Sequence, residues 1–117
     1  MNVLWPSNPA LAKASAVPWL LDGRLVETRD TLQAVYEALD ADTKIVPGHG
    51  PVTDLKTVAW NLDYHNAVEK EITAAIAKGL SLEDTAARLK LTDFEGYALF
   101  SWVHPIFNVS AAYKDLQ

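Results

Sequence analysis

One segment, KIVPGHGPVTD at residues 44–54, limits the folds open to this chain more than any other stretch does. It joins two β-branched residues, Ile45 and Val46, to a Pro-Gly pair and then to His49, which lies between two glycines. Short apolar runs that end at a Pro-Gly pair are typical of buried strands that stop at a turn. The segment therefore predicts a short buried strand over residues 43–48, followed by a constrained loop.

His49 has two interpretations on local grounds. In the first it is an exposed turn residue, because Pro47 and Gly48 fit a type II turn and Gly50 relaxes the backbone again. In the second it is a metal ligand, because flanking glycines remove Cβ crowding and the strand behind the loop fixes the direction of the imidazole. The residues of the loop leave both interpretations open.

Helical periodicity flanks this segment on both sides. Apolar residues at helical spacing predict a helix that begins near Asp30, where Gln33 would complete a capping box. A longer stripe predicts a second helix over about 54–78, with Gly79 as its stop. The residues of that stripe are Leu55, Val58, Leu62, His65, Val68, Ile72 and Ile76.

The C-terminal third continues the helical pattern in shorter pieces. Ser81 and Asp84 have the spacing of a capping box that opens a short helix. The aromatic-rich stretch 91–107 predicts a packed helix that breaks before Pro105, because proline interrupts helices. A last short helix is expected over 109–116.

The N-terminal region differs in composition. Residues 1–26 hold three of the six prolines and two of the four tryptophans, without a sustained period, which predicts an irregular arm with one helical turn near 10–14. The chain then divides into this arm, a helix–strand–loop unit at 27–53, and a set of C-terminal helices at 54–117. We see no linker that would separate two domains.

Composition excludes several classes of function. The net charge is −5 and the ten Lys and Arg residues are scattered, which argues against a nucleic-acid partner. There is no cysteine, so a disulfide framework and a thiolate metal site are excluded. No apolar run approaches the roughly 20 residues that span a bilayer, and no signal peptide is recognisable, so we expect no membrane partner and, by default, a cytoplasmic location.

A helix-turn-helix interpretation of residues 80–103 also fails. Its recognition helix would offer Phe94, Glu95 and Tyr97, but no Lys, Arg, Asn or Gln to contact base edges. The aromatic residues are expected to belong to the core instead.

The run VPGHGPV at 46–52 resembles the closing metal-ligand motif of the metallo-β-lactamase superfamily, in which its histidine is the last zinc ligand, on a loop after a strand. VPWLLDGR at 17–24 and the helical stretch 28–39 are similar to the segment before that loop in many bacterial hydrolases of the family. The stretches 61–91 and 108–116 are similar to their C-terminal helices. These segments occur in family order and cover nearly the whole chain.

The resemblance implies an α/β fold, namely the C-terminal portion of a four-layer αββα domain, mostly helical with a short sheet. It implies that His49 is a zinc ligand. The H-x-H-x-D-H cluster of the family is absent, so the chain is expected to be a partial domain. Asn2 stands where the bridging aspartate of the family would be, and an amide is a poor zinc ligand. His65 and His104 match no family ligand and are expected in the core or at a helix end.

Two functions follow from this resemblance. The first is the C-terminal part of a zinc hydrolase, in which zinc-bound hydroxide attacks an ester, amide or similar acyl group and no side chain of this chain is catalytic. About three protein ligands are needed for such a zinc, so the lone chain is expected to be inactive without a complementing N-terminal half. The alternative is a non-catalytic module that self-associates or binds a partner, and we expect a homodimer or higher oligomer.

Overall fold

The computed structural model describes residues 2–7, 20, 24–94 and 100–117. The chain is mostly helical with a small parallel sheet, which places it in the mixed α/β class. Its elements follow in the order β1 (Val3–Ser7), α1 (Leu25–Ala38), β2 (Lys44–Pro47), α2 (Leu55–Ala77), α3 (Leu82–Arg88), η2 (Thr92–Phe94), α4 (Phe100–Trp102), η3 (Val103–Asn108) and α5 (Val109–Leu116).

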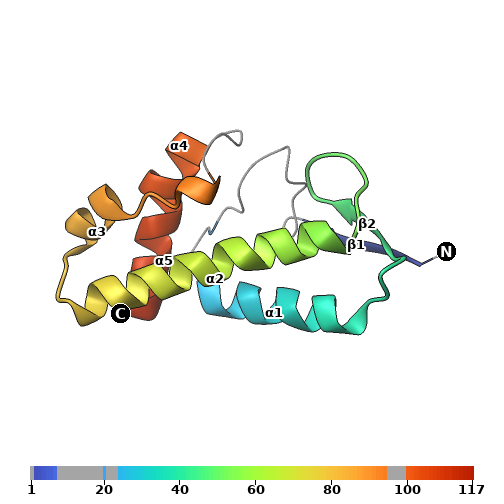
Figure 1. The fold of residues 1–117 in the computed structure, drawn as a ribbon, viewed down its shortest axis with the longest axis horizontal. Helices are drawn as coiled ribbons and strands as arrows, with labels where there is room; N and C mark the ends of the chain where they lie inside the picture. Colours follow the sequence, from blue (N-terminus) through green and yellow to red (C-terminus); the bar gives the residue numbers. More distant parts are fainter. Residues whose placement is uncertain (1, 8–19, 21–23, 95–99) are drawn as a thin grey trace.

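Helix α2 organises the molecule. It runs along the longest axis, with the sheet at one end and α3, α4 and α5 around the other, as Figure 1 shows. The prediction of this helix is confirmed: Asp54 accepts a hydrogen bond from the backbone N–H of Lys56 at its start, and Gly79 adopts a φ of +72° just after its end. With 23 residues, α2 is about 34 Å long.

Strands β1 and β2 form a two-stranded parallel sheet. Strand β2 confirms the expected buried strand, because Ile45 and Pro47 are both buried. The register shifts between Leu4 and Ser7, across Pro6, which has no N–H to give to the ladder. The irregular arm expected over 1–26 is therefore wrong for β1, since this short, proline-containing strand is specified by its pairing with a distant segment. The helical turn expected near 10–14 lies outside the described residues.

Helix α1 begins at Leu25, five residues before the start expected at Asp30. The capping box with Gln33 does not form: Asp30 accepts from the guanidinium of Arg29, and the Gln33 amide donates to Glu37. Leu25 is completely buried, so the first turn of α1 is fixed by packing and needs no side-chain cap. The packing of Leu25 in the core therefore outweighs the local capping signal at Asp30.

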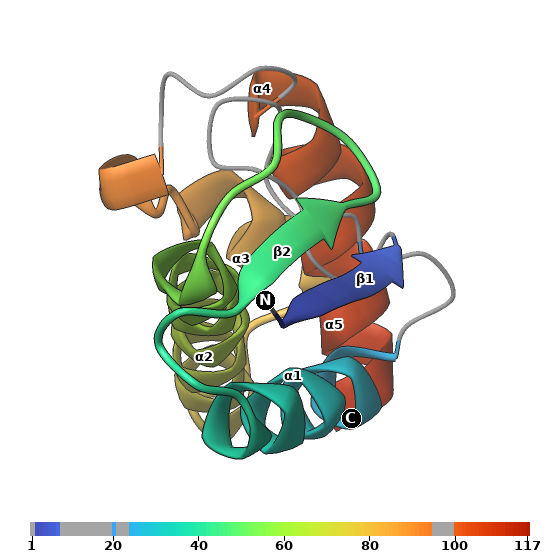
Figure 2. The same cartoon turned by 90° about the vertical axis from the view of Figure 1, so that its right-hand side faces the viewer.

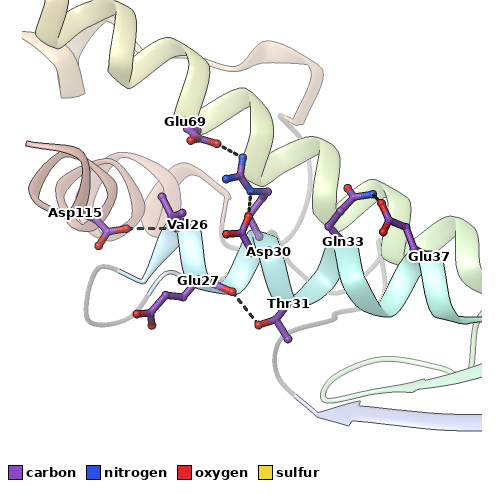
Figure 3. Close-up of polar contacts among 9 residues, drawn as sticks. Val26, Glu27, Asp30, Thr31, Gln33, Glu37, Glu69 and Asp115 are labelled. Carbon is purple, nitrogen blue, oxygen red and sulfur yellow. Dashed lines mark hydrogen bonds and ion pairs between the residues drawn. The ribbon is translucent and has the colours of Figure 1, made fainter.

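Polar contacts join α1 to the helices beside it. Arg29 of α1 forms an ion pair with Glu69 of α2, and both side chains are largely covered. The backbone N–H of Val26 donates to the Asp115 carboxylate of α5 at 3.4 Å. Figure 3 shows these contacts along one side of α1. They tie α1 to α2 and α5 near the end of α1 that lies away from the sheet.

The C-terminal helices confirm part of the expectation. Ser81 caps α3 by accepting from the backbone N–H of Asp84, and α5 has the bounds expected for the last helix. The break expected before Pro105 is wrong, because helical backbone continues from Phe100 to the C-terminus. Pro105 lies in a π-helical turn, in which the N–H of Val109 donates to the carbonyl of the residue five positions before Val109. Such a widened turn is a known way to accommodate an interruption within a helix.

Candidate functional site

The loop that carries the histidine is closed at its base. Ile45 and Thr53 exchange two backbone hydrogen bonds of 2.9 and 2.8 Å, which close the base of a loop. We call this loop, residues 47–52, the PGHG loop. The hydroxyls of Thr53 and Thr57 lie 2.6 Å apart, so the far end of the loop is joined to the first turn of α2. The loop is thus held by a strand on one side and a helix on the other.

His49 is exposed near the tip of this loop. Gly50, the next residue, has a φ of +102°, a backbone conformation that side chains with a Cβ rarely adopt. No hydrogen bond or ion pair holds the imidazole of His49 within the described part of the chain. Both ring nitrogens are therefore open to a ligand or a metal that approaches from solvent.

The other two histidines are buried, as expected. His65 on α2 donates from Nδ1 to the carbonyl of Asn61 at 2.7 Å, and its Nε2 has no partner. His104 donates from Nε2 to the carbonyl of Leu89 at 3.0 Å and stacks on Phe100 at a centroid distance of 4.9 Å. Burial lowers the pKa of both imidazoles. They serve the core and do not extend the site at His49.

A buried polar chain around Tyr64 was missed by the sequence analysis. The Leu20 N–H donates to Asn108 Oδ1, and the amide of Asn108 donates to the Tyr64 hydroxyl, each at 2.8 Å. Because Nε2 of His104 carries the proton given to Leu89, its Nδ1 accepts, so the Tyr64 hydroxyl must donate to it at 2.7 Å. Burial raises the pKa of Tyr64. No spacing rule predicts such a chain, since its members are far apart in sequence.

Asn2 does not share a site with His49. Val3 pairs with Lys44 and Ser7 pairs with Pro47, so in this parallel register Asn2 lies at the edge of the sheet where β2 begins. His49 follows the opposite edge, where β2 ends. The Asn2 amide donates instead to the Asp40 carboxylate at 3.3 Å. In this structure the length of a strand therefore separates Asn2 from the loop that carries His49.

Within residues 2–7, 20, 24–94 and 100–117, no three His, Asp or Glu side chains gather as a metal site. Among these described residues, His49 therefore belongs to no such group. Across the same residues, no helix is both long enough and apolar enough to cross a bilayer.

The sheet adds a second feature next to the PGHG loop. Leu4 and Ile45 point inward to a core formed with Leu32, Val58 and Leu62. The alternate positions form what we call the outer face of the sheet: Val3, Trp5, Val46 and Val52.

Three of these outer side chains are well exposed, with fractions of 59% for Val3, 72% for Trp5 and 62% for Val52. In Figure 2 the strands lie in front of the helices, and no described element covers the outer face of the sheet. Parallel sheets are normally covered on both faces. An apolar surface therefore borders the loop that presents His49.

Comparison with known proteins finds no match to any family model, and no curated protein matches the chain.

Proposed function

We propose that this chain is the C-terminal portion of a metallo-β-lactamase-like zinc hydrolase with an αββα fold, and that His49 supplies one zinc ligand. The observation that carries the proposal is the exposed His49 on a closed loop at the end of a parallel strand. The residues of that loop also carry the resemblance to the closing ligand motif of the family.

The geometry of the loop suits a metal ligand. A ligand must be held in direction before the metal arrives, and the bridge between Ile45 and Thr53 holds the base of the loop to β2. Loops at the carboxyl ends of parallel strands are a common position for ligand sites in α/β proteins. A free turn residue would need neither the closed base nor the connection to α2.

The remaining ligands must come from another polypeptide segment. A catalytic zinc takes about three protein ligands and keeps one position for water, whereas the described residues of this chain contain no group of three His, Asp or Glu side chains that could hold a metal. When fully held, zinc would supply a hydroxide nucleophile for attack on an acyl carbon. The role of this chain is then to position one imidazole and to back the site with its sheet, and we propose that the lone chain is inactive.

A second candidate is a non-catalytic module that binds itself or a partner. The outer face of the sheet favours it, because exposed and contiguous apolar side chains usually mark a surface that another protein covers. Under this alternative His49 is an exposed turn residue that holds no metal.

Native mass spectrometry with and without zinc separates the two candidates. The chain is measured alone and after co-refolding with a polypeptide that carries the H-x-H-x-D-H half of a metallo-β-lactamase-like hydrolase. The hydrolase proposal expects no stoichiometric zinc on the lone chain, and zinc retained in the complex.

The retained zinc should be lost from the complex with His49→Ala and kept with Val52→Ala, a change in the same loop that removes no donor atom. Zinc retention that is indifferent to His49→Ala, or the absence of any complex, would overturn the hydrolase proposal in favour of the second candidate.

A further inference from the structure

We propose that β1 is an association edge, through which two copies of this chain pair antiparallel to form a homodimer with one continuous four-stranded sheet. The proposal does not depend on zinc or on His49. It starts from the backbone of β1.

The side of β1 away from β2 is unpaired among the described strands. The N–H of Lys44 donates to the carbonyl of Asn2 at 2.9 Å, so Asn2 turns its carbonyl toward β2. Backbone groups alternate along a strand, and therefore Val3 and Trp5 turn their N–H and C=O groups outward. The sheet order is β1-β2, and no described strand lies on the outward side of β1.

The sequence of β1 lacks the features that usually prevent pairing at an edge strand. Protected edge strands carry charged side chains, or a proline that removes an outward N–H. No charged residue occurs from Asn2 to Ser7. Pro6 follows the same alternation as Asn2, so its missing N–H falls on the β2 side, where the register shift occurs. The outward donors of Val3 and Trp5 remain.

The edge is complementary to itself. With a two-fold axis through Leu4, Val3 of one copy lies opposite Trp5 of the second copy, and the reverse. Each such pair exchanges both backbone hydrogen bonds, which gives about four bonds in all. Each exposed Trp5 side chain also covers an exposed Val3 side chain, a favourable aromatic and β-branched cross-strand pair. This match favours a second copy over an unrelated strand.

Charge distribution allows the contact. The chain carries a net charge of −5, which repels a second copy at long range, but the strand at the contact is neutral. Salt screens the long-range repulsion without weakening the apolar and backbone contacts. Dimerisation should therefore strengthen as ionic strength rises.

The antiparallel arrangement also makes the proposed dimer independent of the proposed zinc site. Antiparallel pairing places the two PGHG loops at opposite ends of the four-stranded sheet, so two copies cannot share one zinc at His49. Dimerisation should be unchanged by a chelator and by His49→Ala.

Sedimentation velocity over a concentration and salt series tests the edge. Val3→Pro removes one outward N–H in each copy, and the loss of two hydrogen bonds should raise the dimer dissociation constant about tenfold or more. Trp5→Lys should do the same by placing a charge on the edge. Val52→Lys is the matched control, since it puts the same charge on the outer face but away from β1. Circular dichroism checks that each variant keeps its helices.

A disulfide trap tests the register, because the chain has no cysteine. Leu4→Cys places two thiols opposite each other in a non-hydrogen-bonded pair with Cα atoms about 4.5 Å apart, within disulfide range. Oxidation should cross-link this variant and not Val52→Cys. A monomer at all concentrations and salts, equal weakening by Val52→Lys, or association that requires zinc and His49 would each overturn the proposal.

Discussion

The two ends of α2 differ in how completely they are built. Around its C-terminal half, α3, α4 and α5 enclose a large core in which buried polar groups such as Tyr64 and Asn108 find partners. Around its N-terminal half, a small core lies under the sheet, whose outer face is open. The difference indicates that the stability of this chain comes mainly from the helical end, while the sheet end has a smaller core and leaves apolar side chains exposed.

The largest expected effect on stability comes from truncating one buried side chain at each end of α2. Ile72 in the helical core and Ile45 in the sheet core are both completely buried. We expect Ile72→Ala to lower the free energy of unfolding by about 4 kcal/mol, and Ile45→Ala by about 2 kcal/mol, because the smaller core can relax around the deletion. Urea unfolding measures both. Equal losses would mean that the two cores are equally well packed, contrary to the comparison.

A second test concerns the polar chain at the helical end. Tyr64→Phe removes the hydroxyl that accepts from Asn108 and donates to His104, so each of these two buried side chains loses a hydrogen bond. We expect a loss of about 2 kcal/mol in the free energy of unfolding. Tyr113→Phe is the matched control: its hydroxyl donates only to the Leu80 carbonyl, in a partly exposed place, so its loss should stay below about 1 kcal/mol. Similar losses in the two variants would show that the hydrogen bonds around Tyr64 contribute no more to stability than the single bond of Tyr113.

A third expected effect is a dependence of stability on pH. Burial lowers the pKa of His65 and His104 below the ordinary value of 6.5, and nearby Arg29 lowers that of His65 further. The unfolded chain then binds protons that the folded chain does not. The free energy of unfolding is therefore fully present above about pH 6.5 and falls below it, by up to about 1.4 kcal/mol per pH unit for each histidine.

Urea midpoints from pH 8 to pH 5 measure this effect. Carboxylates contribute to the same range, so the informative quantity is the difference between the chain and His65→Leu, which should lose stability less steeply in acid. Identical slopes would show that His65 does not remain neutral in the folded chain.

The sequence correctly predicted the structural features that are determined by residues close together in the chain. The start of α2 after Asp54, its end before Gly79, the cap of α3 and the strand before the PGHG loop each depend on residues only a few positions away. The N-terminal strand, the early start of α1 at Leu25 and the passage of the helix through Pro105 depend on contacts between distant segments. Periodicity contains no information about those contacts.

The same division applies to the candidate site. The loop and the exposure of its histidine follow from the local run of glycines and prolines, and one of the two local interpretations of His49 required that exposure. The separation of Asn2 from His49 depends on the register between β1 and β2, which only the paired strands fix. Whether His49 holds zinc stays a prediction, because the other ligands would lie on a different segment.

The link between the PGHG loop and α2 has a thermodynamic consequence. A molecule that binds the ordered loop and not the unfolded chain raises the melting temperature by mass action, in proportion to the logarithm of its concentration above its dissociation constant. Thr53 and Thr57 join that loop to a helix that also forms part of the core around Ile72. The melting temperature of the distant helices should therefore report whether the loop is occupied, whatever molecule binds there.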